Sequence, residues 1–210
     1  MEAAAILSVL SIVGLFVFAV SGALTALRND MDVFGVAMIA FATGVGGGTI
    51  RDVLLGAFPV WWIREPEAIL ICVAGSIVAT LAQPAIASRL KALIWADAAG
   101  LAVFAVIGAE AAIASGASPV IAIFMGAATA TFGGIVRDVL CNETPLVLKE
   151  EIYATAALVG AGVYVGLLET GVGAAAAAVV AALLTFAIRA LAIVFNIKSP
   201  KFGRPRAPGT

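Results

Sequence analysis

The sequence predicts an all-α membrane protein with seven transmembrane helices, arranged as two inverted three-helix repeats plus a seventh helix. Three observations predict this fold class. The chain has 210 residues, of which 63% are hydrophobic and 12% are charged, whereas an ordinary soluble domain is about half apolar and about a quarter charged. Its apolar stretches are long enough to cross a bilayer. A motif of eight residues also occurs twice, at residues 47–54 and 133–140.

Seven apolar stretches reach or approach the length of about 20 residues that a transmembrane helix requires. In chain order they cover residues 3–27, 33–63, 68–87, 92–114, 119–140, 152–168 and 172–195. The second stretch is long and is expected to end near Pro59, and the sixth is short and rich in glycine. The first is interpreted as a span and not as a cleaved leader, because Glu2 stands where a secretory signal carries positive charge.

The distribution of lysine and arginine predicts the orientation. With the amino terminus outside, one basic residue, Arg64, falls on the outer side. The inner side then receives Arg28, Arg89, Lys91, Lys149, Lys198, Lys201, Arg204 and Arg206. Because cytoplasmic loops carry the excess of basic residues, we expect a multi-pass protein of the cell (inner) membrane with its carboxy terminus in the cytoplasm.

The duplicated motif predicts the internal symmetry. Residues 47–54 read Gly-Gly-Thr-Ile-Arg-Asp-Val-Leu, and 86 residues later residues 133–140 read Gly-Gly-Ile-Val-Arg-Asp-Val-Leu. With the same offset, Phe18 falls on Phe104 and Pro59 on Pro145. Each repeat holds three spans, so the second must enter the membrane from the opposite side, as in many transporters. The predicted units are residues 1–87, the inverted repeat 88–170, the seventh helix 171–196 and a basic cytoplasmic tail 197–210.

Glycine runs lie halfway along the second and fifth spans. They comprise Gly46, Gly47 and Gly48 in the second span and Gly133 and Gly134 in the fifth. Sharp kinks tend to occur at such positions, and a break would free carbonyls that must face protein or a water-filled cavity. Flanking hydroxyls that would add cation ligands belong to Thr43, Thr49, Thr129 and Thr131. The alternative is that these glycines simply permit close helix packing.

Arg51 and Arg137 give the strongest indication of function. A charge inside a spanning helix costs at least about 2.5–3.5 kcal/mol, so it normally faces a cavity or a partner. Because adjacent helical residues point in different directions, partners are expected from other helices. The candidates are Asp97 and Glu110 in the fourth span, and Asp52 and Asp138 across the pseudo-twofold axis. The alternative is a purely structural ion pair that locks the repeats together.

Other classes of function find little support in the sequence. The chain has no histidine, and Cys72 and Cys141 lack partners at ligand spacing, so no metal site is predicted. Without a nucleophile–base set an enzyme is not expected. Nucleic-acid binding would need a basic stripe, which is missing outside the last dozen residues. No cofactor is expected beyond permeant K⁺ or Na⁺ and bound membrane lipid.

The doubled Gly-Gly-x-x-Arg-Asp-Val-Leu motif, the three-plus-three arrangement and the extra helix resemble the bacterial relatives of trimeric intracellular cation (TRIC) channels, over about residues 5–195. The resemblance implies a homotrimer with a pore in each protomer, which passes potassium and, less selectively, sodium. It also implies that the kinked second and fifth helices line the pore. Along the path it places Gly46–Gly48, Arg51, Gly133, Gly134 and Arg137. The residues beside them, Thr49, Asp52, Thr129, Thr131 and Asp138, complete the predicted pore and gating residues.

Two features qualify the expectations that the resemblance raises. Animal members carry a lysine-containing motif linked to phosphoinositide lipid at the second-helix break, where this chain reads Gly46-Gly47-Gly48-Thr49, so that regulation is not expected. The bacterial proteins also carry the label of a glycine-transporter-like domain. The alternative function is therefore a secondary transporter for glycine or another small zwitterion, whose carboxylate Arg51 or Arg137 would bind.

Overall fold

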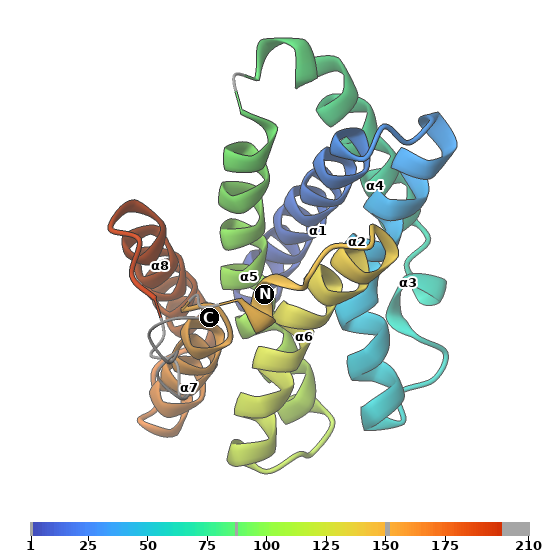
Figure 1. Ribbon diagram of the computed structural model, residues 1–210. Helices are drawn as coiled ribbons and strands as arrows, with labels where there is room; N and C mark the ends of the chain where they lie inside the picture. Colours follow the sequence, from blue (N-terminus) through green and yellow to red (C-terminus); the bar gives the residue numbers. More distant parts are fainter. Residues whose placement is uncertain (1, 87, 150–151, 199–210) are drawn as a thin grey trace, which may run out of the picture.

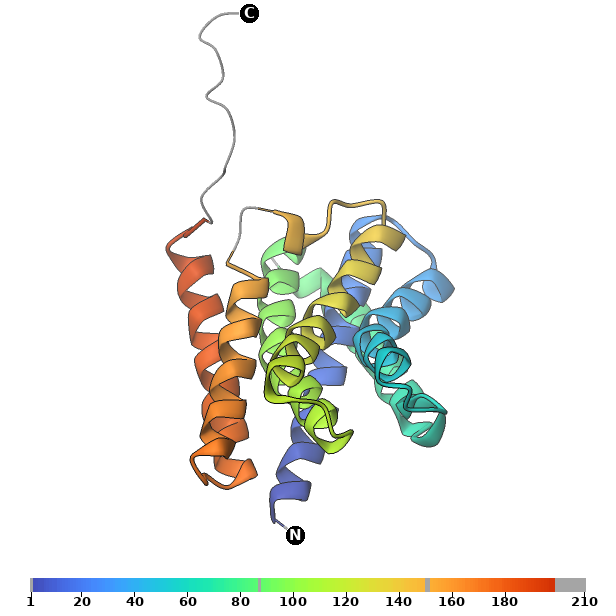
Figure 2. The same cartoon turned by 90° about the horizontal axis from the view of Figure 1, so that it is seen from below.

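The computed structural model describes residues 2–86, 88–149 and 152–198. These residues form a bundle of long helices joined by short connections (Figures 1 and 2). The elements in chain order are α1 Glu2–Arg28, α2 Val33–Leu55, α3 Trp61–Arg64, α4 Glu67–Ala82, η1 Gln83–Ala85, α5 Arg89–Ala114, α6 Pro119–Leu140, η2 Leu146–Leu148, α7 Ala154–Glu169 and α8 Ala174–Val194.

Six of the helices are long and apolar enough to cross a membrane: α1, α2, α4 extended by η1, α5, α6 and α8. The shorter α7 is apolar but has 16 residues, which span about 24 Å at about 1.5 Å per residue. Large apolar side chains such as Phe34 and Leu81 lie exposed on the outside of the bundle. The chain is thus an all-helical, multi-pass membrane protein. In Figure 2, α1 begins at one end of the bundle and α8 finishes at the other.

The helix ends reflect local capping chemistry. Asp32 caps α2 by accepting a hydrogen bond from the Gly35 N–H at 2.7 Å. The same helix stops at Leu55, short of both residue 63 and Pro59, so the predicted extent of the second span is wrong. The cause is Gly56, whose φ of 68° ends the helix in the left-handed region. Asn142, at the equivalent position after α6, has a φ of 54°.

Part of the predicted chain organisation lies outside the described residues. This applies to residue 87 at the end of the third predicted span, to residues 150–151 in the break before the sixth, and to the basic tail from residue 199 onward.

Helices at equivalent positions of the duplicated sequence pack in equivalent ways. The pairs α1 and α5, α2 and α6, and α4 and α7 are related by the offset of 86 residues. Helix α1 packs on α2 and α4, just as α5 packs on α6 and α7, while α1 contacts α5 and α2 contacts α6. Helix α8 covers α5 and α7.

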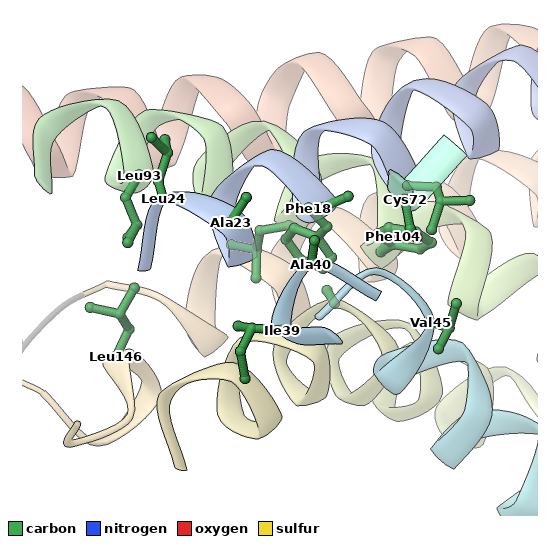
Figure 3. Packing of buried hydrophobic residues seen from close by; sticks show 14 of the residues in the cluster. Phe18, Ala23, Leu24, Ile39, Ala40, Val45, Cys72, Leu93, Phe104 and Leu146 are labelled. Carbon is green, nitrogen blue, oxygen red and sulfur yellow. The ribbon is translucent and has the colours of Figure 1, made fainter. Parts of the chain in front are cut away.

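The centre of the bundle is marked by two equivalent aromatic residues. Phe18 of α1 and Phe104 of α5 stack with ring centroids 5.1 Å apart and an interplanar angle of 26° (Figure 3). Both side chains are buried. Small residues surround them, and Gly100 lies so close to the Phe18 ring that any side chain there would clash. Small residues at helix contacts allow the close approach that drives association in a membrane.

Candidate pore region between α2 and α6

Helices α2 and α6 contact each other through the duplicated glycines. A Cβ added to Gly133 would lie 2.5 Å from the carbonyl oxygen of Thr43, and one added to Gly47 would lie even closer to the carbonyl oxygen of Thr129. These two contacts are equivalent under the offset of 86 residues. The absence of side chains therefore brings the two backbones together at a matched pair of points.

The expected breaks in these helices are wrong. Helix α2 runs from Val33 to Leu55 and α6 from Pro119 to Leu140, and both continue through their glycines. The alternative interpretation, close packing, describes the role of Gly47 and Gly133. Gly48 and Gly134 instead face aromatic side chains, those of Trp61 and Tyr153. Gly46 has Val136 at ordinary contact distance.

The threonine hydroxyls are engaged with their own helices. Thr43, Thr129 and Thr131 donate to the carbonyl oxygens four residues earlier, at 2.6, 2.7 and 2.9 Å. Thr49 does the same at 2.8 Å and also accepts a hydrogen bond from Trp62 Nε1 at 3.0 Å. Such back-bonding satisfies the hydroxyl hydrogen and leaves oxygen lone pairs as acceptors.

Arg137 lies in a cluster of polar groups that is buried away from solvent. Its Nη1 donates to Asp97 Oδ1 on α5 and to Ser21 Oγ on α1, both at 2.6 Å. Its Nε donates to Asp138 Oδ1 at 2.8 Å. Arg137 and Asp97 are both 0% exposed. The guanidinium thus joins three helices, and Asp97 is confirmed as a charge partner.

Arg51 lies in a simpler environment. Its Nε and Nη2 donate to Asp52 Oδ1 at 2.8 and 2.7 Å. Among the described residues, Asp52 is its only ion-pair partner. Arg51 is 8% exposed, so its side chain is close to full burial without being sealed.

The expectation that neighbouring Asp residues cannot pair with these arginines is wrong. The rule of divergent directions applies to Cα–Cβ vectors, but an arginine side chain is long enough to turn back to the next residue's carboxylate. Glu110 is also wrong as a charge partner for the arginines. It is half-buried and instead accepts a hydrogen bond from the hydroxyl of Tyr164 on α7.

The two Asp residues have a second role that sequence reasoning missed. Asp52 Oδ2 accepts from the backbone N–H of Trp61, the first residue of α3, at 2.7 Å. Asp138 Oδ2 accepts from the N–H of Leu146, the first residue of η2, at 2.9 Å. Each carboxylate therefore holds the start of the short helix that comes after its span. The aligned Pro59 and Pro145, which precede these helices, were the signal that could have found this role.

Three further residues of the site were not predicted. Ser21 is neutral and small, and its sequence neighbourhood offered no signal. Tyr153 is 1% exposed and precedes α7, while Arg189 of α8 lies over its ring, with Cζ 5.0 Å from the centroid. Arg189 is 1% exposed and donates to the Ile152 carbonyl at 2.9 Å.

A pocket of about 520 Å³ opens beside α1, α3, α4 and α5. Its polar lining comprises Ser8, Ser11, Trp61, Glu65, Glu67 and Glu110. The remaining lining is apolar. Three carboxylates and two hydroxyls in its lining make this a negatively charged recess at the end of the bundle where α1 begins.

Comparison with known proteins identifies the family. A family model described as "Glycine transporter" matches the chain twice, at residues 8–84 and 94–169. The chain is 41% identical over 202 residues to a UPF0126 membrane protein of Vibrio cholerae, covering 94% of this chain and 83% of that one. It is 40% identical over 196 residues to the inner membrane protein YadS of Escherichia coli K12, covering 92% and 94%.

Solved structures give the same result. The TRIC trimeric intracellular cation channel orthologue from Rhodobacter sphaeroides superposes with a TM-score of 0.88 at 46% identity, covering 91% of this chain and 98% of that one. A prokaryotic TRIC channel crystallised in 0.5 M KCl superposes with a TM-score of 0.86 at 36% identity, covering 91% and 97%. The chain belongs to the trimeric intracellular cation (TRIC) channel family.

Proposed function

We propose that this protein is a channel for monovalent cations, potassium among them, with its path inside one protomer between α2 and α6. The observation that carries the proposal is the likeness, at 46% identity and over 91% of this chain, to a protein described as a cation channel orthologue. Membership of a channel family also argues against an enzyme.

The concentration of buried polar groups supports this position of the path. In a bundle whose interior is otherwise mostly small and apolar, α2 and α6 together contribute most of the buried polar side chains. These are Thr43, Arg51, Asp52, Thr129, Thr131, Arg137 and Asp138. Polar side chains inside a membrane protein normally mark an ion or substrate pathway.

The arginines do not oppose a cation path in this arrangement. Each guanidinium contacts the carboxylate of the next residue, and Arg137 contacts Asp97 as well. Paired in this way, neither arginine presents an uncompensated positive charge to a passing ion. We propose that the pairs act as gate elements, and that the less constrained Arg51 pair is the one that separates or becomes hydrated when the constriction opens.

Seven crossings, in two inverted repeats and a final helix, are the topology we propose. The matched contacts of α1 with α5 and of α2 with α6 support the inverted repeats. The ends of α1 and α8 lie at opposite ends of the bundle (Figure 2), which supports an odd number of crossings with α7 as the short sixth. The excess of basic residues at the α8 end supports an outer amino terminus.

The negatively charged pocket then lies at the outer mouth. Clefts lined by one sign of charge raise the local concentration of counter-ions. Glu65, Glu67 and Glu110 would therefore attract cations to this end of the protomer. We further propose a homotrimer in lipid, because the similar solved protein is described as trimeric.

A conductance measurement tests the proposed function. Purified protein in planar bilayers should pass potassium but not choline. Absence of cation-selective current would overturn the channel. The description of the matching family model supports a second candidate, a glycine transporter. Saturable uptake of glycine into proteoliposomes, with counterflow and without conductance, would favour that candidate instead.

A further inference from the structure

Three buried polar atoms make no hydrogen bond of good geometry within the described part of the chain: Arg137 Nη2, Asp97 Oδ2 and Tyr153 Oη. Their side chains are 0%, 0% and 1% exposed. The position that a Cβ would take on Gly134 lies 3.0 Å from Tyr153 Oη, 3.4 Å from Asp97 Oδ1 and 3.6 Å from Arg137 Nη2. Groups from α5, α6 and the start of α7 therefore converge over one glycine.

The chemistry of these atoms defines the kind of ligand that can satisfy them. Arg137 Nη2 can only donate, Asp97 Oδ2 can only accept while it is ionised, and Tyr153 Oη can do both. A ligand that satisfies all three must be both a donor and an acceptor. Buried water typically makes about three hydrogen bonds to otherwise unsatisfied groups.

Local charge argues against an ion at this point. Arg137 and Arg189 supply two positive charges, and Asp97 and Asp138 supply two negative ones. Arg137 contacts both carboxylates, and Arg189 lies over the ring of Tyr153. An added cation or anion would be an uncompensated charge among fully buried groups, which is strongly unfavourable. A neutral ligand would not be.

We propose that Gly134 forms the floor of a binding site for a single water molecule, which bridges Arg137, Asp97 and Tyr153. Glycine is required there because a methyl group would occupy the space beside Tyr153 Oη. The water links the Arg137 cluster to Tyr153 and hence to the start of α7. This water connects neighbouring helices inside the bundle, and its existence does not depend on the proposed conductance.

The equivalent glycine of the first repeat provides a contrast. Gly48 faces the indole of Trp61, and the three atoms closest to an added Cβ all belong to that ring. No carboxylate or guanidinium is among them. Trp61 Nε1 is itself buried without a hydrogen-bond partner among the described residues. The space at Gly48 is filled by its ring, and the combination of a guanidinium, a carboxylate and a hydroxyl is specific to the second repeat.

A crystal structure at a resolution that shows ordered water is the direct test. A single peak within hydrogen-bond distance of all three atoms would support the proposal. A direct Tyr153–Asp97 hydrogen bond with no peak between the three atoms would overturn it. Crystals grown with rubidium and bromide should give no anomalous signal there, and a signal would show an ion site instead.

A thermodynamic cycle gives an independent test. Tyr153→Phe should lower the midpoint of thermal unfolding by about 2–4 °C. In a Gly134→Ala background, where the methyl group displaces the water, Tyr153→Phe should have little further effect. Equal effects in both backgrounds would overturn the proposal. Gly162→Ala is the matched control background, because a Cβ there meets no atom within 4 Å. If Gly134→Ala does not fold, the crystallographic test decides.

Discussion

The two copies of the duplicated motif share their sequence but not their surroundings. Arg137 is sealed by Asp138, Asp97 and Ser21, whereas Arg51 contacts Asp52 alone among the described carboxylates. The reason lies in the neighbouring helices. The position that Asp97 takes in α5 is occupied by Ser11 in α1.

This difference shows how duplication can assign two roles to one motif. A guanidinium held by three helices cannot move without separating them, so Arg137 fixes the second half of the bundle. A guanidinium held only by its neighbour can move with little disturbance of packing. Arg51 therefore suits the moving part of a gate, and substitutions in the two copies can test this division.

The largest expected effect is on stability when Arg137 is removed. Arg137→Ala leaves Asp97 and Asp138 buried without their counter-charge, and breaking a buried pair in this way costs about 3–5 kcal/mol. Arg51→Ala should cost clearly less, because Asp52 keeps its hydrogen bond from the Trp61 N–H. Thermal unfolding of the two purified variants measures the difference. Equal losses would remove the distinction between the two copies.

The next largest loss of stability should be the same in both copies of the duplicated motif. Gly47→Ala and Gly133→Ala each place a Cβ against a backbone carbonyl that cannot rotate away, and such overpacking costs about 1–3 kcal/mol or more. Both variants should unfold at similar, lower temperatures, while Gly166→Ala, with open space around it, should not lose stability. A large difference between the first two would show that the α2–α6 contact is not symmetric.

A smaller effect is expected on gating, and it depends on the proposed channel. Arg51→Ala should change the open probability several-fold, since about 1 kcal/mol corresponds to about a factor of five. The potassium-to-sodium permeability ratio should stay nearly constant, because the wall of the path is otherwise intact. Single-channel recording measures both quantities. A changed ratio at constant open probability would instead assign Arg51 to selectivity.

The smallest expected effect on stability comes from a substitution that makes the surroundings of Arg51 resemble those of Arg137. Ser11→Asp puts a carboxylate where the second repeat has Asp97, and the added pairing with Arg51 should raise the free energy of unfolding by about 0.2–1 kcal/mol. The open probability should fall at the same time. Ser8→Asp, in the same pocket wall, is the control and should change neither. A result reversed between the two variants would contradict the assumed equivalence of Ser11 and Asp97.

The fold was largely predictable because its main signals are local. Apolar length marks spans, and the repeat motif is identical at six of its eight positions. The end of α2 was misjudged because residues 56–63 are almost as apolar as the helix before them. Only the left-handed geometry at Gly56 marks the point where the helix ends.

The sequence allowed the site to be predicted only at its charged residues. Arg51, Arg137 and Asp97 are conspicuous as charges in apolar sequence, and the Arg137–Asp97 pair was anticipated. Ser21 and Tyr153 are not conspicuous, because hydroxyl groups are common in membrane helices and acquire importance only through tertiary contact. The glycines were assigned to helix breaks because spacing alone does not distinguish a bend from a close backbone contact.

The hydrogen bonds of Asp52 have a mechanical consequence. One of its oxygens holds Arg51 and the other holds the first residue of α3, whose side chain lines the pocket. A displacement of Arg51 that carries Asp52 with it must therefore pull on the pocket wall. Conversely, anything that pushes Trp61 aside strains the Arg51 pair. The Asp52 carboxylate therefore couples any movement of Arg51 in the interior of the bundle to a movement of Trp61 at the pocket.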